Sequence, residues 1–556
     1  MAGVQTLSVD GQPGTSATIR VRGAGSINAE MDPLIIVDGM PFDGDLSSIN
    51  TNDIESMTVL KDAASTALYG ARGANGIIMI TTKKGKKGDA KINFEARWGV
   101  NTRQVENYDV LKSPGEYMER LYTAYYNAFL YNEDLGKDIA HVYANDAIMD
   151  GGIGKGYQIY TVPDGETLVG ADGKLNPNAK LGYSDGKYYY TPDDWEEETF
   201  KRQNRQQYDL SIAGGTDNFN YFFSLGYIND GGVIPNSAFE RLSTRLKVDY
   251  QAKKWLKVGA NAAYSHSKSR KPGEQQSINS TGNAFFIANF IAPVYPLYVR
   301  NADGSFMYDN GRRVYDYGDG KSSNGNRQWM SIANPLGDLT YNKEVYQHDI
   351  FNGGLSADIT PIKGLTLTAK YGIYVDNERG DMLSNAYMGQ SAAYHGGASQ
   401  EANRDYALDQ QYIGNYNFTV NDVNSFDITV GYDGYHLRMT SLSGYGTELY
   451  NPESFFLSNA TKNFSISGSQ DEYSTAGYFA RFNYGYAEKY FANVSYRRDS
   501  SSRFSEDNRW GDFWSASAAW LISKESFLEG VKWIDMLKVK ASYGEQGNDN
   551  IGNYFE

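Results

Sequence analysis

The chain has 556 residues, a formal net charge of −15 at pH 7 and no cysteine. The acidic balance argues against a general binder of nucleic acid or anionic lipid, and the lack of cysteine excludes disulfides, thiolate metal sites and a cysteine nucleophile. With 45 Tyr and 59 Gly beside 14 Pro, the composition favours many strands and turns. No apolar run approaches the ~20 residues of a membrane-spanning helix. Averaged hydropathy does not detect membrane strands, because their apolar and polar residues alternate.

Residues 1–88 are predicted to form a small mixed α/β module. Alternation predicts a strand in "SATIRVRG", and a short buried strand is expected in "PLIIVDG". The segment "NTNDIESMTVLKD" combines a capped turn with a strand, and "AASTALYG" predicts a short helix that Gly70 ends. A further strand is expected in "GIIMITTKKG", before the basic run "KKGKKG" closes the module.

From residue 91 onward the apolar residues recur with a period of two, which predicts antiparallel strands. In 241–250, for example, every second residue is apolar or Thr, and the residues between them are Arg, Ser, Lys or Asp. We count about 13 such strands, one near 91–100 and the rest between 206 and 544. If the apolar face meets lipid, the side chains expected there include Leu242, Leu246, Leu367, Ile373 and Val539.

The connections favour a membrane barrel over a soluble sandwich, because short and long ones alternate along the chain. Short turns such as "TPIKG" and "NDVN" alternate with longer connections near 230–240, 266–345, 379–406, 440–473 and 501–511. An outer-membrane barrel has short periplasmic turns and long extracellular loops. We therefore predict a membrane all-β fold, an antiparallel transmembrane β-barrel over 89–556 with a long extracellular insertion at about 101–205.

The two ends of the sequence suggest a piece of a longer protein. The start, Met1 to Val4, has neither a basic nor an apolar signal region. A plugged outer-membrane barrel can have 22 strands, so about 13 strands would leave such a barrel incomplete. We expect both ends of the protein to be missing.

Two blocks of the N-terminal module resemble the SusC/RagA family of TonB-dependent outer-membrane transporters. The first contains I-R-x-R-G, D-P-L and V-D-G-x-P, and the second contains N-D-I-E-S, V-L-K-D-A, Y-G-x-R-G-A-N-G and I-T-T-K-x-G. Order and spacing fit throughout, and the resemblance covers about the first 88 residues. The residues that carry it, here called the plug signature, include Arg20, Arg22, Gly23, Asp38, Gly39, Lys61, Asp62, Tyr69, Gly70, Arg72, Gly73, Asn75 and Gly76.

We interpret the plug signature as mostly structural. Its glycines suit tight turns and close approaches, Asp38 before Gly39 suits a turn, and its arginines can pair with acidic groups inside a wet barrel. The resemblance implies that residues 1–88 are the C-terminal part of a plug and that the barrel lies in the outer membrane of a Gram-negative cell. It also implies that a TonB box and an N-terminal extension belong to the missing beginning.

The resemblance also implies a function. A protein of this family imports a bulky nutrient, most often an oligosaccharide and alternatively a peptide. TonB, with ExbB and ExbD, supplies the energy, and a SusD-like surface lipoprotein acts as a lid. Neither a cofactor nor nucleic acid is involved. The aromatic run Tyr188, Tyr189, Tyr190 with Trp195 is a candidate platform for stacking on sugar rings, although aromatic girdles are common in barrels anyway.

Other functional classes remain open at this stage. Gly182–Gly186 fits G-x-S-x-G, but it lies in a predicted surface loop, whereas a nucleophile elbow needs a strand before it and a helix after it. The five histidines are scattered and show no metal-binding spacing. We therefore expect no enzyme and no metal site. The alternatives are a surface protein that binds or degrades glycans, and a passive porin, which would need no plug.

Overall fold

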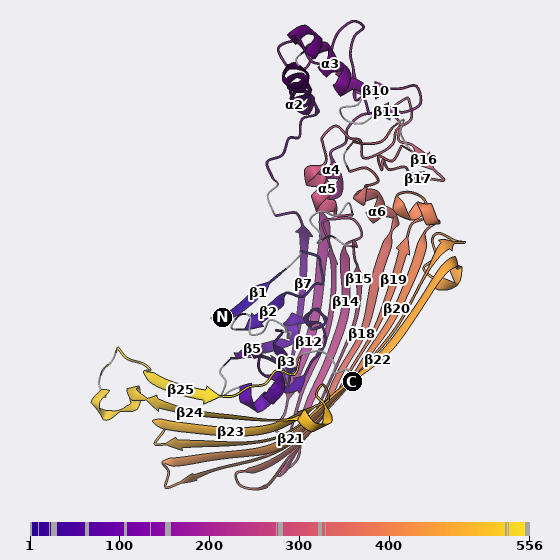
Figure 1. Ribbon diagram of the computed structural model, residues 1–556. Coiled ribbons are helices and arrows are strands. Elements are labelled where there is room, and N and C mark those ends of the chain that lie inside the picture. The colour runs from indigo at the N-terminus through magenta and orange to yellow at the C-terminus, as the bar shows by residue number, and fades with distance from the viewer. Residues whose placement is uncertain are drawn as a thin grey trace.

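The computed structural model describes residues 3–8, 11–21, 23, 31–61, 66–104, 108–133, 135–150, 157–273, 275, 282–320, 325–328, 330–528, 531 and 533–550. A large sheet curves around a small N-terminal module, and a helical tip stands above one rim of the sheet (Figure 1). Among the described residues, no helix has the length and apolar character needed to cross a membrane.

The sheet has thirteen strands, and each strand pairs antiparallel with its neighbours in sheet order, as the alternating sequence predicts. Chain order and sheet order coincide, from β7 at one edge to β25 at the other. The strands are β7 (Gly88–Asn101), β12 (Gln203–Gly215), β13 (Phe219–Gly231), β14 (Ala238–Lys253), β15 (Leu256–Arg270), β18 (Lys343–Ile362), β19 (Leu365–Ser384), β20 (Gly397–Val420), β21 (Asn424–Leu449), β22 (Ala460–Tyr486), β23 (Tyr490–Ser501), β24 (Trp510–Leu521) and β25 (Lys538–Gly544).

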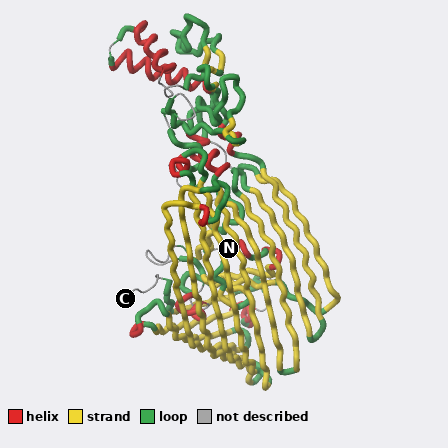
Figure 2. The backbone as a smooth tube through the Cα atoms, turned by 90° about the vertical axis from the view of Figure 1, so that its right-hand side faces the viewer, coloured by secondary structure: helices red, strands yellow, loops and turns green. Residues whose placement is uncertain are grey.

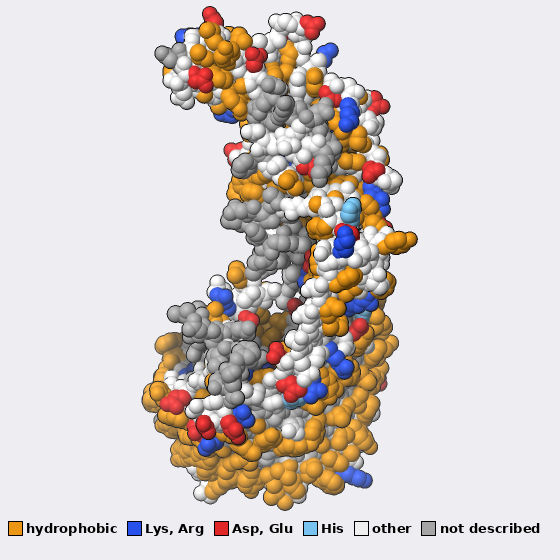
Figure 3. Space-filling model, turned by 45° about the vertical axis from the view of Figure 1, so that its right-hand side comes forward, with side chains coloured by type: hydrophobic (Ala, Val, Ile, Leu, Met, Phe, Trp, Pro, Cys, Tyr) orange, Lys and Arg blue, Asp and Glu red, His pale blue; other side chains and the backbone are white. Residues whose placement is uncertain are grey.

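One face of this sheet is apolar and exposed, as expected of a barrel wall in lipid. Leu242, Leu246, Leu367 and Val539 are each 44–56% exposed, and Ile373 is intermediate. These side chains meet neither a second sheet nor a layer of helices, and the lower outer surface is a broad apolar belt (Figure 3). The predicted fold class, an antiparallel barrel wall with an α/β plug, is confirmed.

Two of the expected long connections are largely strand instead. The segment 379–406 contains the end of β19 and the start of β20, and 440–473 contains the top of the β21–β22 hairpin. Here both faces of the strands carry polar residues, because a strand that rises above the membrane needs no lipid-facing side. The alternating pattern therefore fades while the hydrogen-bonded ladder continues.

The N-terminal module lies inside the concave face of the sheet (Figure 2). Its four-stranded sheet has the order β4-β3-β6-β5, with β3 and β6 parallel. A separate hairpin pairs β1 with β2. The elements are β1 (Val4–Leu7), β2 (Thr18–Val21), β3 (Leu34–Val37), β4 (Met40–Pro41), η1 (Leu46–Ser48), η2 (Thr51–Asp53), β5 (Ile54–Leu60), η3 (Ala67–Arg72) and β6 (Ile77–Thr82).

The helix expected to end at Gly70 is a short 3-10 helix that continues to Arg72 across a kink at Gly70. The module shares its apolar core with the wall, since Val37, Ile78 and Ile80 pack in one cluster with Tyr374 and Tyr435 of the strands. The module is thus a plug seated against the wall. Its predicted limits, 1–88 against 89–556, remain a prediction.

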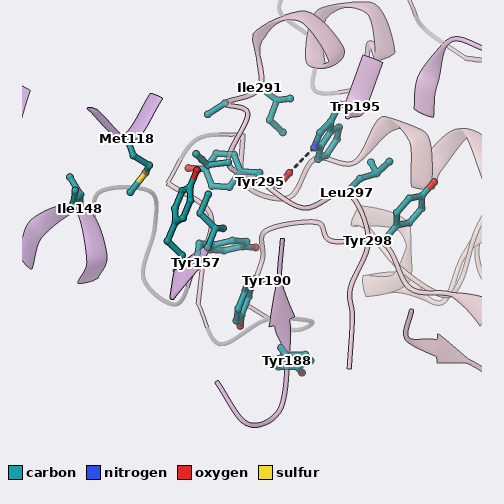
Figure 4. Packing of buried hydrophobic residues seen from close by; sticks show 14 of the residues in the cluster. Met118, Ile148, Tyr157, Tyr188, Tyr190, Trp195, Ile291, Tyr295, Leu297 and Tyr298 are labelled. Atoms are coloured by element: carbon teal, nitrogen blue, oxygen red, sulfur yellow. Dashed lines mark hydrogen bonds between the residues drawn. The ribbon is translucent and has the colours of Figure 1, made fainter. Parts of the chain in front are cut away.

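The tip module consists of the described residues of 102–202 and 271–342, which come from the two longest connections. Its helices are α2 (Pro114–Asn127), the π-helix η4 (Ala128–Asn132), α3 (Lys137–Asp150), α4 (Trp195–Thr199), α5 (Ala284–Phe290) and α6 (Pro335–Tyr341). Its short strands are β8 (Tyr160–Thr161), β9 (Lys180–Leu181), β10 (Tyr183–Ser184), β11 (Tyr189–Tyr190), β16 (Tyr308–Asp309) and β17 (Arg312–Arg313). Both connections contribute to one buried core (Figure 4), so the tip folds as a unit.

The remaining connections contain single turns of 3-10 helix. They are η5 (Gln390–Tyr394) and η6 (Leu457–Asn459) on the side of the tip, η7 (Glu506–Asn508) after β23, and η8 (Ile522–Lys524) with η9 (Ser526–Leu528) between β24 and β25. The short turns between β12 and β13 and between β20 and β21 lie at the opposite rim from the tip (Figure 1).

Candidate functional site between plug and barrel wall

The turn after β3 fixes the plug to the wall through Asp38. This residue has φ 52°, a conformation that Asp tolerates better than most side chains. Its carboxylate accepts hydrogen bonds from the Thr82 backbone N–H (3.0 Å) and hydroxyl (2.6 Å), and from Lys247 Nζ of β14 (2.8 Å). Burial raises the pKa of Asp38, but Lys247 and Thr82 outweigh this and hold it below its usual value. Asp38 therefore stays ionised in a nearly closed site.

A second set of contacts ties η1 and η2 of the plug to the same part of the wall. Asp53 lies 3.6 Å from Arg245 Nε of β14, and Asn50 and Asn52 donate to the two carboxylate oxygens of Asp209 on β12 at 2.7 and 2.6 Å. In addition, Arg241 donates to the Ile49 carbonyl at 3.0 Å. We call this side of the plug the anchored flank: Asp38, Asn50, Asn52 and Asp53 held by Asp209, Arg241, Arg245 and Lys247.

The opposite flank of the plug carries Arg72, which lies against an aromatic wall. The Arg72 guanidinium is 4.3 Å from the ring centroid of Tyr435 on β21 and 3.3 Å from Asp43 Oδ1. The Tyr435 hydroxyl donates to the other oxygen of Asp43. Burial lowers the pKa of Arg72, but Asp43 and nearby groups more than offset this and raise it above its usual value. The side chain is thus a permanent cation with both charge and π partners.

Two glycines of the plug signature allow close packing that a side chain would prevent. A Cβ on Gly70 (φ 54°) would overlap Asp499 Oδ2 of β23, and a Cβ on Gly76 (φ 85°) would lie 2.8 Å from Val21. Gly70 thus lets the η3 turn touch the wall directly, and Gly76 lets the start of β6 pack against β2. The close contacts at Gly70 and Gly76 support a structural role for these two plug signature residues.

The other plug signature residues surround these contacts. Arg20 pairs with Gln5 in the β1–β2 hairpin, and the Gly39 carbonyl accepts from Gln411 of β20 at 3.2 Å. Gly73 donates its N–H to Gly70. Gly23, Lys61, Tyr69 and Asn75 also lie on the plug, and Tyr69 lines the cavity described below, whereas Arg22 and Asp62 lie outside the described residues. A functional role for these residues stays a prediction.

A cavity of about 400 Å³ lies between the plug and the wall, beside the contacts that Arg72 makes with Tyr435. On the plug side it is lined by Leu34, Ile36, Tyr69 and Arg72, and on the wall side by polar residues of β19 to β23 that include Gln411, Asn415, Thr429 and Arg481. A smaller cavity, of about 250 Å³, lies beside Asp38 and Lys247, so both flanks of the plug combine close contacts with small gaps.

The aromatic candidates of the tip are mostly core residues. Trp195 is 4% exposed and donates its indole N–H to the Tyr295 carbonyl at 3.0 Å, and Tyr188 and Tyr190 are 6% and 3% exposed (Figure 4). In this conformation the three buried rings present no face to a ligand. Only the half-buried Tyr189 retains an accessible surface, so ligand stacking stays a prediction for that ring alone.

The described residues do not support a metal centre or a nucleophile elbow. No group of three or more His, Cys, Asp or Glu among them could hold a metal ion. Ser184 of the G-x-S-x-G segment lies in the two-residue strand β10 and donates to the Ala302 carbonyl at 3.2 Å. Neither a preceding long strand nor a following helix exposes its hydroxyl.

Sequence reasoning missed the wall half of the site. The residues are Asp209, Arg241, Arg245, Lys247 and Tyr435, which lie far along the chain from the plug. One signal existed: 241–247 places Arg241, Arg245 and Lys247 on one strand face, an unusual run of cations for a lumen unless acidic partners occupy it. Asp38 and Asp53 are those partners.

Comparison with known proteins agrees with this arrangement. Residues 1–77 match the family described as TonB-dependent Receptor Plug Domain. The chain is 30% identical to the TonB-dependent receptor SusC of Bacteroides thetaiotaomicron over 100% of its own length and 50% of that protein. It is 27% identical to TonB-dependent receptor P26 of Formosa agariphila, of which it covers 49%. The structure of the RagAB peptide transporter superposes with a TM-score of 0.76 at 26% identity, covering 100% of this chain and 58% of that one. The chain belongs to the SusC/RagA family.

Membership in the SusC/RagA family places the apolar face of the wall in the outer membrane. The chain spans about half the length of the curated relatives it matches. The relatives are described as receptors and as a peptide transporter, which agrees with a plugged barrel rather than a surface enzyme.

Proposed function

We propose that the SusC/RagA protein carrying this chain imports a bulky polar nutrient across the outer membrane by TonB-dependent transport, with ExbB and ExbD coupling TonB to the inner-membrane proton gradient. The observation that carries the proposal is the plug itself, which sits inside the concave wall and is held there by buried polar and ionic contacts. A passive pore has no use for such a domain.

The chemistry of the interface suits a plug that must move and return. Contacts such as Asp38 with Lys247 bind tightly in a closed site, yet water can replace both partners once the lumen opens. A purely apolar interface between plug and wall would instead expose apolar surface to water each time the plug moves. Ligand binding on the outer side is expected to change the preferred position of the plug and so expose its TonB-binding segment, which is a coupling between two sites.

For the cargo we propose an oligosaccharide, with a peptide as the second candidate. The oligosaccharide rests on the resemblance to SusC-type signatures. The peptide is favoured by the similarity to RagAB, which is described as a peptide transporter. Both are polar chains too large for ordinary porins, and both would meet the same polar lumen.

We also propose that a SusD-like surface lipoprotein covers the outer side. The tip module supports this, because η4 and α3 expose apolar side chains to solvent. Tyr131 is 76% exposed, and Ile139, Val142 and Tyr143 are 48–49% exposed. An apolar patch of this kind on an extracellular surface suits a protein partner, whose closing over the lumen would act as a gate.

The test is uptake by cells that carry the full-length protein and its neighbouring lipoprotein. Fluorescein-labelled malto-oligosaccharide and fluorescein-labelled peptide serve as probes. Saturable uptake of one probe should disappear in cells without TonB and after collapse of the proton gradient. Removal of the plug should convert it into unsaturable leakage. Uptake that continues unchanged without TonB would reject active import and support a porin, whereas cleavage of a probe at the cell surface would support the enzyme alternative.

A further inference from the structure

We propose that the outer face of the wall binds a phosphorylated lipid of the outer leaflet, whose phosphate lies on three arginines of β19 to β21 and whose acyl chains fill an apolar groove directly below them. The site lies on the opposite face of the sheet from the plug, so it is independent of the lumen and of the proposed import. It is carried by the arrangement of the arginines, their height above the rim with the short turns and the position of the groove.

The three arginines lie on a diagonal across adjacent strands. Arg379 on β19 pairs with Ala402, two positions from Arg404 on β20. Arg404 in turn pairs with Thr440, two positions from Arg438 on β21. Residues two positions apart share a face of the sheet, and diagonal neighbours on adjacent strands lie about 7–8 Å apart. At this spacing three long guanidinium side chains can reach one anionic group, and we call them the arginine diagonal.

The arginine diagonal faces away from the plug. Arg404 lies four positions from Leu408, which is 43% exposed on the apolar outer face, whereas Ala407 faces the other way and packs in the core shared with the plug. The side chains of Arg379 and Arg438 are 53% and 52% exposed, and Arg404 is also exposed. All three guanidinium groups are therefore accessible from the side of the lipid.

The arginine diagonal keeps donors for a further anion. Arg379 contacts Asp381 at 2.9 Å. Arg438 contacts Glu472 at 2.8 Å. Both guanidinium groups are half exposed, and exposed ion pairs are weak. Among the residues that the structure describes, Arg404 between them forms no ion pair with a carboxylate. Because a guanidinium has five N–H donors and binds phosphate oxygens in pairs, the diagonal offers a phosphate one unpaired cation and two flanking ones.

The height of the arginine diagonal matches the head groups of a membrane. Phe418 and Phe426 pair with each other on the outer face, beside the short turn between β20 and β21. Arg404 lies fourteen positions from Phe418 along β20. Arg438 lies twelve positions from Phe426 along β21. At about 3.4 Å per residue and a tilt of about 35–45°, the arginines lie roughly 30–40 Å above that rim. An apolar band is about 25 Å tall, so the guanidinium groups lie just beyond it. Figure 3 shows basic side chains above the apolar belt on this outer face.

A groove of about 770 Å³ lies in the outer face below the arginine diagonal. Its floor includes Ala262 of β15 and Gly353 of β18, which pair with each other. Its upper end includes His436, two positions from Arg438. None of the described plug residues lines it. The apolar side chains around it include Leu246, Phe351, Leu355, Tyr371, Leu408 and Tyr432. The groove is therefore an apolar recess in the lipid-facing side of the wall, and it begins at the arginines.

A phosphorylated lipid is the occupant that fits both parts of the site. The groove lies within the apolar belt, where acyl chains surround the wall in a membrane. The arginines lie at the level of head groups, and arginine suits phosphate because its planar group donates two hydrogen bonds in parallel. A free anion would leave the groove unused, and a second copy of the chain would have to bring an acidic group to the same height. Charge complementarity together with the groove therefore favours a lipid whose head group carries phosphate.

The experiment measures the binding of lipid A by the purified full-length protein in uncharged dodecyl maltoside micelles. Native mass spectrometry quantifies the complex during titration with diphosphorylated lipid A and with lipid A from which the phosphates have been removed. Arg404→Gln removes the central charge, and Ala262→Leu fills the floor of the groove. Arg498→Gln is the matched control, because Arg498 of β23 also faces outward and its side chain is 52% exposed. The melting temperature of each variant without lipid A shows whether it is folded.

We expect Arg404→Gln to weaken the binding of diphosphorylated lipid A by about tenfold or more. Ala262→Leu should also weaken it, and Arg498→Gln should leave it unchanged. The dephosphorylated lipid should bind the parent protein as weakly as the intact lipid binds Arg404→Gln. Arg438→Gln replaces Arg404→Gln if that variant does not fold.

Equal affinity of the parent protein and Arg404→Gln, or an equal loss in Arg498→Gln, would overturn the site. Unchanged affinity in Ala262→Leu would overturn the groove as the place of the acyl chains. Displacement of lipid A by excess inorganic phosphate would indicate a site for free anions, and protein dimers without lipid A would assign this face to a second copy. Either result would also overturn the proposal.

Discussion

Gly70 of the plug touches the carboxylate of Asp499 on β23 so closely that any side chain at position 70 would overlap Oδ2. The two residues are far apart in sequence, yet their contact determines how closely the η3 turn approaches the wall. A glycine in the family-like Y-G-x-R-G-A-N-G segment is thus explained by a contact across the lumen.

Gly70→Ala is expected to loosen the plug. The substitution puts a side chain into a backbone conformation that L residues rarely adopt (φ 54°, ψ −130°), at a cost of about 1–3 kcal/mol, and adds a steric overlap with Asp499. Gly23→Ala is the matched control, because Gly23 also has positive φ (86°) but no atom of the described residues lies within 4 Å of the position its Cβ would take. Sensitivity of the plug to limited proteolysis in the full-length protein measures the effect. Equal sensitivity of the two variants would mean that the contact with Asp499 contributes nothing.

Lys247→Met is expected to destabilise the seated plug strongly, because it leaves Asp38 ionised beside a more distant Arg245. Breaking one partner of a buried ion pair costs about 3–5 kcal/mol. The exposed pair Lys87–Asp217, with side chains 70% and 75% exposed, is the control. Asp217→Asn should cost less than about 1 kcal/mol.

Entry of a large antibiotic into cells measures this loosening. Lys247→Met should raise entry and Asp217→Asn should not. Adding Asp38→Asn to Lys247→Met should restore part of the barrier, since Asn tolerates the φ of 52° and removes the stranded charge. A double variant that leaks more than Lys247→Met alone would contradict the ion-pair explanation.

The alternating pattern predicts the strands of the wall well only where contact with lipid requires every second side chain to be apolar. Around Leu242 and Leu367 one face must be apolar, so the strands and their orientation can be recognised from sequence. In the upper part of β20, where Glu401, Asn403 and Asp405 face one side and Arg404 the other, nothing demands an apolar face. Strand formation there depends on neighbours in the ladder, which a single strand's sequence does not reveal.

The contacts of the candidate site are also hard to predict from the sequence, because the residues that meet there are far apart along the chain. The motif around Asp38 identifies a plug and a turn, but the partner Lys247 lies 209 residues away, and no periodicity connects the two. The aromatic run at 188–190 fits a stacking platform and a buried core equally well, because Tyr is common in both. Only the packing of the tip decides that Tyr188 and Tyr190 are core residues.

Trp195→Ala and Tyr189→Ala are expected to separate stability from binding in the tip. Trp195 is buried and hydrogen-bonded to Tyr295, so its truncation should cost about 3–5 kcal/mol of tip stability. Tyr189 is half-buried, so its truncation should leave stability nearly unchanged. If Tyr189 stacks on a sugar, affinity should fall by about 1–3 kcal/mol, by analogy with stacking on bases. Thermal unfolding and probe binding measure the two effects. An unchanged melting temperature for Trp195→Ala would contradict its place in the core.

The tip is also expected to become less stable as pH rises, because of Asp338 on α6. Burial raises the pKa of Asp338 to about 6, although the hydrogen bond from the Tyr317 hydroxyl (2.8 Å) partly opposes this. The unfolded carboxyl titrates near its ordinary value of about 4. Between these two values the folded tip binds a proton that the unfolded tip has lost. The resulting stabilisation is fully present below the unfolded pKa and is lost as pH rises through about 6.

Thermal unfolding of the tip at about pH 5 and about pH 8 should therefore differ by roughly 1–3 kcal/mol, with the lower pH more stable. Asp338→Asn should reduce this difference, because the amide keeps an acceptor for Tyr317 and cannot ionise. Burial also raises the pKa of Asp316 in the tip, so a part of the pH dependence should remain. Glu453→Gln should leave it in place: hydrogen bonds from Arg312 and Tyr387 lower the pKa of Glu453 to about 2, so this group stays ionised across the whole range. A pH dependence that Asp338→Asn does not reduce would belong to another group, and one that runs in the opposite direction would show that folding lowers the pKa of Asp338.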